Sequence, residues 1–140
     1  MIHRVLFIGR WYVDFLFAED SYDEEEVLSY LKDMGVSKAT VSDVLDLMQV
    51  ENNTGFTVTD PSSFLALVVI GPTTSGEEFI NTLVHEVYHL ASAIASSLGV
   101  NLRGEVPAYI AGDTALSLTE LICDMGCTRE HIHRKSFEKQ

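Results

Sequence analysis

Two histidines four residues apart, with a glutamate directly after the first, are the side chains of this sequence best suited to chemistry. They lie in the stretch His85-Glu86-Val87-Tyr88-His89. On a helix, His85 and His89 project from one face, where they can hold two corners of a tetrahedral zinc site. Glu86 then lies beside the metal, outside the ligand pair, and can take a proton from a zinc-bound water. The alternative is that the two histidines only pair with neighbouring side chains.

The residues around this motif predict the helix that it needs. Ser75 and Glu78 have the S-x-x-E spacing of a capping box, so a helix can start directly after Ser75. Gly99 predicts the end of that helix. Between these signals the apolar residues recur at helical spacing, namely Phe79, Ile80, Leu83, Val84, Val87, Leu90, Ala91, Ile94 and Leu98. The motif therefore has the structural context that a metal site requires.

A catalytic zinc site takes three protein ligands and leaves the fourth position for water. Proline is tolerated only in the first helical turn, so Pro107 places Glu105 at the start of the next helix. We expect this helix to return antiparallel and to bring Glu105 back towards His85 and His89 as the third ligand. Asp113 lies about two turns further along and is expected to hydrogen-bond a ligand histidine or to replace Glu105. The alternative for Glu105 is a solvated carboxylate favoured by the helix dipole.

Hydrolysis at such a site also needs a donor for the negative charge that develops on the substrate oxygen. Tyr109 or Tyr88 could supply it from a phenol. We prefer Tyr109 because it lies one helical turn from Glu105, whereas Tyr88 can simply pack against a sheet. The alternative for either residue is a packed tyrosine with a solvated hydroxyl.

The motif and its surroundings resemble a known group of enzymes. The resemblance lies in three segments before the motif, in the motif itself and in two residue pairs after it. These are residues 53–57, 67–71 and 77–82, then 85–89, then Gly104-Glu105 and Ala108-Tyr109. They resemble small predicted zinc metallopeptidases of the minimal gluzincin type, which occur in bacteria, phages and mobile elements. In gluzincins the third zinc ligand is a glutamate on the helix after the H-E-x-x-H helix, which corresponds here to Glu105. The resemblance covers roughly the second half of the chain, and the segment between His89 and Glu105 is shorter than in many gluzincins.

The length and net charge of the chain limit the number of domains and the classes of partner that we expect. The chain has 140 residues, 46% of them hydrophobic, which is enough for one domain over residues 1–140 that buries a core without disulfides. A formal net charge of -12 excludes nucleic acid and anionic membrane surfaces as expected partners, because phosphate contacts need clustered lysine and arginine. No segment has the pattern of a signal peptide or the apolar length of a membrane span, so we expect a cytoplasmic protein.

Two cysteines and two histidines near the end of the chain could be interpreted as a second zinc site. Cys123 and Cys127 are four residues apart, and His131 and His133 follow them. We favour one buried and one incidental cysteine instead, because the spacing does not match that of structural zinc sites. After Asp124 the composition becomes polar, and residues 129–140 are predicted to form a mobile tail.

Strand signals occur in two separate parts of the sequence. Residues 5–8 and 12–17 are rich in β-branched and aromatic residues and predict either one long strand bent at residues 9–10 or a tight hairpin there. Residues 56–59 alternate between apolar and polar, as a half-buried strand does, and residues 64–70 form a continuous apolar run of strand length.

Signals for two helices occur in the sequence between these two groups of strands. An acidic run leads into a helix that Ser21 or Asp23 can cap and that Gly35 can end. A second short helix is predicted to open at Thr40 or Ser42. The apolar residues expected to face inward on it are Val44, Leu45, Leu47 and Met48.

The order of these elements predicts an α+β fold, with a small, mainly antiparallel sheet packed on helices. The gluzincin resemblance implies, in addition, a zincin-like arrangement in which the H-E-x-x-H helix is followed by a glutamate-bearing helix. In such proteins the strand near the motif borders the cleft, and an extended peptide can add to its free edge. Residues 64–70 are the candidate for that strand.

These observations predict a Zn2+-dependent hydrolase, specifically a peptidase that acts on a peptide or protein substrate. His85, His89 and Glu105 are the predicted metal ligands, and Glu86 and Tyr109 are the predicted catalytic residues. The competing hypothesis is a catalytically silent binding or regulatory module of a phage or mobile element, which keeps zinc for folding. Such a module would be expected to lose the base before the ligands, so the presence of Glu86 favours the enzyme.

Overall fold

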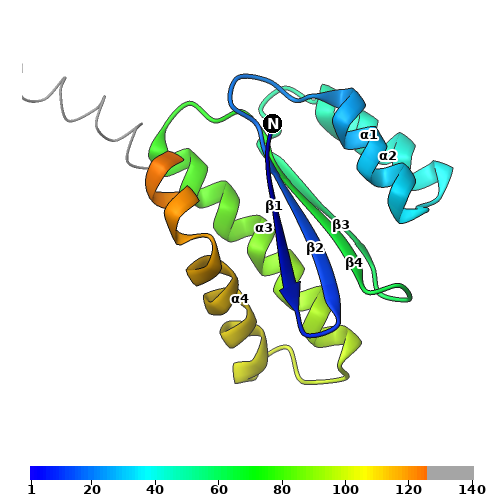
Figure 1. Ribbon diagram of the computed structural model, residues 1–140, viewed down its shortest axis with the longest axis vertical. Coiled ribbons are helices and arrows are strands. Elements are labelled where there is room, and N and C mark those ends of the chain that lie inside the picture. Colours follow the sequence, from blue (N-terminus) through cyan, green and yellow to red (C-terminus); the bar gives the residue numbers. More distant parts are fainter. Residues whose placement is uncertain (126–140) are drawn as a thin grey trace, which may run out of the picture.

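The chain forms three layers, with a four-stranded sheet between two pairs of helices (Figure 1). The computed structural model describes residues 1–125. Its elements in chain order are β1 (Ile2–Ile8), β2 (Trp11–Phe17), α1 (Glu24–Met34), α2 (Lys38–Gln49), β3 (Gly55–Asp60), β4 (Leu65–Ile70), α3 (Gly76–Ser97) and α4 (Glu105–Ser117). A further helical segment spans residues 119–125. The predicted α+β class is confirmed.

The sheet is mixed, with the strand order β1-β2-β4-β3. β1 pairs antiparallel with β2, and β3 pairs antiparallel with β4, but β2 and β4 run parallel. β4 therefore has hydrogen-bonded neighbours on both sides, and the prediction of a free edge at residues 64–70 is wrong. In the part of the chain that the structure describes, the free edges of the sheet belong to β1 and β3.

The first two strands form a tight hairpin. Ile8 pairs with Trp11, so residues 9–10 alone make the turn. Gly9 has a φ of 58°, which is the positive value that the first position of a type II′ turn requires and that glycine adopts without strain. Of the two predicted conformations, a bent strand or a hairpin, the hairpin is confirmed.

The two helices between β2 and β3 differ in how well their local signals predicted them. α1 begins after Asp23, whose side chain accepts a hydrogen bond from the amide of Glu26, and it ends at Gly35 with a φ of 70°, as expected. α2 begins earlier than predicted, because Ser37 caps the amide of Thr40. Leu47 was expected to face inward but is 39% exposed.

Two hydrophobic clusters hold the layers together. One lies between the sheet and α3, and its β2 members are Trp11, Val13, Phe15 and Phe17. The other lies between the sheet and the α1–α2 pair, with Leu16, Leu67 and Val69 from the strands. Because successive strand residues point to opposite faces, a central strand buried on both faces needs a nearly continuous apolar run. Asp14 interrupts that run and is considered below.

α3 has the ends that its sequence predicts. The hydroxyl of Ser75 accepts a hydrogen bond from the amide of Glu78 at 3.1 Å, and Gly99 follows the helix with a φ of 70°. The Glu78 carboxylate accepts hydrogen bonds from the amide and the hydroxyl of Thr74. None of the helices in residues 1–125, α3 included, has both the length and the apolar character needed to cross a bilayer.

The residues proposed as a second zinc site are only partly described. Cys123 is a free, exposed thiol. Cys127, His131, His133 and the predicted tail at residues 129–140 lie outside the described residues. Cys123 is therefore not the buried cysteine of that prediction, and the burial of Cys127 is not tested.

Candidate metal centre

The middle of α3 brings His85, Glu86 and His89 into one cluster. Their potential ligand atoms all lie within 4.8 Å of one another. The two histidine Nε2 atoms lie 3.1 Å apart, within hydrogen-bond distance, and the imidazole rings meet edge to face with centroids 4.7 Å apart. The helical spacing of the motif therefore has the consequence that the sequence predicts, which is that both imidazoles converge on one point.

This arrangement fits a transition-metal ion. Two nitrogens of a tetrahedral zinc site lie about 3.3 Å apart, because each zinc–nitrogen bond is about 2.0–2.1 Å long. The observed separation of the Nε2 atoms, 3.1 Å, is close to that distance. Both histidines are exposed, so an ion can reach them from solvent. Imidazole nitrogen is a ligand suited to zinc, copper, iron and nickel, and the donor set itself does not distinguish among these metals.

Glu86 differs from the histidines because it is buried, at 5% exposure. The hydroxyl of Thr57, on β3, donates a hydrogen bond to Glu86 Oε1 at 3.0 Å. The other oxygen, Oε2, lies 4.0 Å from His85 Nε2. A buried carboxylate is costly unless it is hydrogen-bonded, so Thr57 both offsets that cost and fixes the orientation of the side chain. One carboxylate oxygen is thus anchored, and the other faces the histidine cluster.

The close approach of β3 to α3 depends on small residues. A Cβ atom at Gly55 would lie 2.8 Å from the carbonyl oxygen of Val69 and 2.9 Å from Thr82 Cγ2. Beside it, the Thr82 hydroxyl donates to the Thr54 hydroxyl at 2.8 Å. Only glycine fits at position 55, and this contact holds the strand that carries Thr57 against the helix that carries Glu86.

Replacing Gly55 with alanine is therefore expected to destabilise the protein by about 1–3 kcal/mol, the usual cost of overpacking a filled site. The matched control is Gly112→Ala in α4, because no neighbouring atom of residues 1–125 lies within 4 Å of a Cβ at Gly112. That change is expected to be neutral or to stabilise by up to about 1 kcal/mol, since glycine is unfavourable inside a helix. Thermal or urea unfolding measures both variants, and equal stability of the two would contradict the packing argument.

A tyrosine supports the start of β3. Tyr22 donates a hydrogen bond from its hydroxyl to Asn53 Oδ1 at 2.7 Å, in the loop that leads into the strand. Burial, followed by the negative charge of Glu86, raises the pKa of Tyr22 to about 12. Its phenol therefore stays neutral and acts as a hydrogen-bond donor throughout the physiological pH range.

The cluster lies in a cleft of about 490 Å³ between α3 and the edge strand β3. Thr57 and Thr59 of β3 line one side of this cleft, and His85, Glu86 and His89 line the other. Within residues 1–125, β3 pairs only with β4, so its outer edge offers unpaired backbone N–H and C=O groups in the same place. The cleft thus combines a possible metal centre with a strand edge that an extended chain can pair with.

The structure does not bring Glu105 to the histidines. Glu105 is the first residue of α4, as Pro107 predicts, and it is exposed. α4 packs against α3 and β1, whereas the flank of α3 that carries Glu86 contacts β3 at the opposite edge of the sheet. Glu105 is accordingly not a member of the cluster around His85, Glu86 and His89.

Asp113 and Tyr109, the other predicted site residues of α4, likewise lie away from the histidine cluster. Asp113 lines a separate cavity with residues of β1. Tyr109 is 67% exposed and is not one of the described residues that line the cleft between α3 and β3. Tyr88, the less favoured tyrosine, has its ring centroid 6.1 Å from that of His89. Of the two phenols considered, Tyr88 is the one beside the cluster.

Thr57 and Gly55 are the residues of this site to which the sequence analysis gave no role. Both lie in residues 53–57, a segment that carries the gluzincin resemblance, and this resemblance was the available signal.

Comparison with known proteins adds no assignment of function. No protein-family model, curated protein or solved structure matches the chain. The function is therefore inferred from the site itself.

Proposed function

We propose that the protein is a zinc-dependent peptidase whose active centre is the cluster of His85, Glu86 and His89. One observation carries the proposal. Two imidazole Nε2 atoms converge at a zinc-like distance beside a buried glutamate that a neighbouring strand anchors by one oxygen. A purely structural pair of surface histidines would not need a buried carboxylate next to it, because burial of that group is costly.

Each residue of the cluster has a distinct role in this proposal. His85 and His89 bind zinc through Nε2. The bound ion would lower the pKa of a coordinated water and polarise the substrate carbonyl. Glu86 receives the water proton on Oε2, the oxygen that Thr57 does not hold, and then delivers it to the leaving amine. Thr57 is a positioning residue, because it acts only through Glu86.

The edge of β3 supports a peptide as the substrate class. An extended peptide can pair with the free edge of this strand by main-chain hydrogen bonds, which places its backbone along the cleft that contains the cluster. The net charge of -12 favours neutral or cationic peptides over acidic ones.

Zinc-dependent cleavage of unstructured peptides tests this function. The full-length protein is incubated with zinc and a mixture of peptides of varied sequence, and mass spectrometry detects new peptide termini. Cleavage that stops on chelation and returns with zinc supports the proposal. A protein that binds zinc tightly but cleaves neither peptides nor unfolded proteins would instead fit the silent, zinc-stabilised module.

A further inference from the structure

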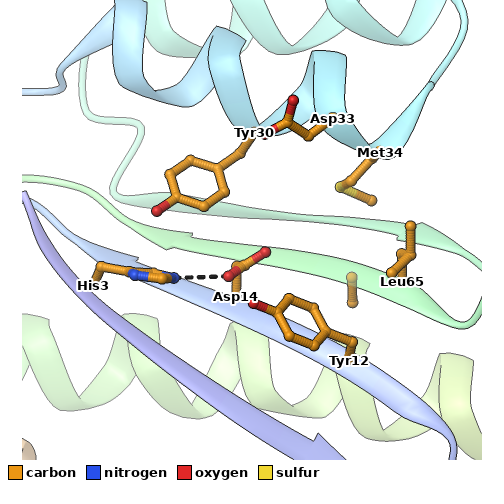
Figure 2. Close-up of a pocket in the computed structure, with 8 residues that line it drawn as sticks. His3, Tyr12, Asp14, Tyr30, Asp33, Met34 and Leu65 are labelled. Carbon is orange, nitrogen blue, oxygen red and sulfur yellow. Dashed lines mark hydrogen bonds and ion pairs between the residues drawn. The ribbon is translucent and has the colours of Figure 1, made fainter.

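A second cavity, of about 410 Å³, lies on the sheet face that α1 covers (Figure 2). Its volume is within the range of about 300–1,000 Å³ that is usual for small-molecule sites. His3 of β1 and Tyr12 and Asp14 of β2 form its floor, and Tyr30 projects from α1 above them. The metal cluster belongs to α3 on the other face of the sheet, so the two sites are separate.

Asp14 is the residue of this cavity that the fold does not explain. It lies on a central strand between the buried Val13 and Phe15, and it is itself only 9% exposed. Its Oδ1 atom is 2.7 Å from His3 Nε2. Within residues 1–125, Oδ2 has no hydrogen-bond partner, and Figure 2 shows it turned away from His3 into the cavity. A buried carboxylate with a free oxygen favours a positively charged ligand.

The aromatic side chains of the cavity suit the same kind of ligand. Tyr12 and Tyr30 lie on two sides of Asp14, and the Tyr30 ring is 5.2 Å from that of His3. Aromatic faces attract cations, and they also pack against short alkyl chains. Met34 adds an apolar surface beside them.

The electrostatic field at the cavity has the matching sign. The pKa of Tyr30 is raised by burial first and then by the negative charge of Asp14, with further contributions that include Asp33. The potential that opposes ionisation of this phenol also attracts a cation. Among the described residues that line the cavity there is no lysine or arginine, and the one basic side chain, His3, is held at Oδ1 of Asp14.

We propose that this cavity binds a small organic cation, an alkylammonium or alkylguanidinium group, with Asp14 as its counter-ion and the rings of Tyr12 and Tyr30 packed against it. A divalent metal ion fits less well, because hard cations take several oxygen ligands at once, and Asp14 and Asp33, the two carboxylates that line the cavity, do not belong to a group of described residues that could hold a metal ion. The same cationic group could belong to a free amine or to a lysine or arginine side chain of a peptide.

Titration with n-butylammonium tests the proposal, because this ion is the end of a lysine side chain and n-butanol is its neutral analogue. We expect saturable amide chemical-shift changes around Asp14 and Tyr30 in full-length protein, with a Kd on the order of a millimolar for so small a ligand. n-Butanol should give no saturable change. A peptide with one central lysine and its norleucine analogue form the second arm, and tighter binding of the lysine peptide than of free amine identifies a peptide source.

Variants separate recognition of the positive charge from non-specific apolar binding. Asp14→Asn should weaken n-butylammonium binding by at least about tenfold, because the amide oxygen can still accept a hydrogen bond but lacks the negative charge that pairs with the cation. Asp43→Asn, at an exposed position of α2, changes the net charge equally and should bind like the wild type. Tyr30→Leu should weaken binding about three- to tenfold and Tyr30→Phe should not, because phenylalanine keeps the ring face.

Several outcomes would overturn the inference. They are the absence of saturable shifts near Asp14, equal binding of n-butanol and n-butylammonium, and unchanged binding by Asp14→Asn. If Asp14→Asn does not fold, as judged by its amide spectrum, the tyrosine pair decides. Equal affinity of Tyr30→Leu and Tyr30→Phe then excludes the aromatic cation site.

Discussion

Replacing His89 with alanine is expected to abolish tight zinc binding. The wild-type protein, exposed to zinc and then desalted, should retain about one ion per chain, because residues 1–125 contain one such ligand cluster. His89→Ala removes one of the two converging Nε2 atoms. Loss of an outer-shell partner lowers metal affinity by about 10- to 100-fold, and loss of a direct ligand should lower it further. Elemental analysis and competition with a chromophoric chelator measure the two proteins.

Stability gives an independent measurement of the same prediction. Zinc at about 100 times its Kd should stabilise the wild-type fold by about 2.7 kcal/mol and leave His89→Ala unchanged. His3→Ala is the matched control, because this histidine lies on β1 and outside the cluster. Wild-type protein that retains no zinc, with a melting temperature unaffected by chelators, would refute the metal centre.

Glu105→Ala, measured in the same way, addresses the third ligand. The gluzincin resemblance implies that zinc affinity falls as steeply as in His89→Ala. The position of α4 on the β1 side of α3 implies that affinity is unchanged. A loss would mean that α4 takes a different position when the metal is bound.

Replacing Glu86 with glutamine is expected to leave zinc binding intact and to lower kcat for peptide cleavage by about 10²–10⁴-fold, the usual contribution of a general base. Glutamine has nearly the same shape, and its carbonyl oxygen can still accept the hydrogen bond from Thr57. Only the capacity to take a proton is removed. Steady-state kinetics on a cleaved peptide, together with zinc content, separates these two effects.

Thr57→Val provides the graded comparison for the glutamate. Valine keeps the shape of threonine but cannot donate to Glu86 Oε1, so kcat should fall by less than in Glu86→Gln while zinc content is unchanged. Restoration of activity by Thr57→Ser would assign the effect to the hydroxyl. Loss of zinc in Glu86→Gln would contradict the proposed role, because it would make Glu86 a ligand instead of a base.

The sequence by itself determined the features of this protein that depend on neighbours within one element. The capping residue Ser75, the helical recurrence of apolar residues and Gly99 were sufficient for α3, and the i, i+4 spacing then places His85 and His89 on one face. The cap and the end of α1 were equally local. Hydrogen bonds and side-chain directions within a helix follow from residue order, so these predictions did not need the rest of the chain.

Only the tertiary structure decided what lies beside the motif. β3 reaches α3 because β4 inserts between β2 and β3, and this strand order makes Thr57 the partner of Glu86. The side of α3 on which α4 packs was also undetermined, since α4 has apolar residues on its solvent-exposed side as well, including Val106, Tyr109 and Leu116. A helix without one clear apolar face does not specify its partner surface. Its packing, and with it the position of Glu105, depends on the sheet edge that remains to be covered, which is a property of the whole fold.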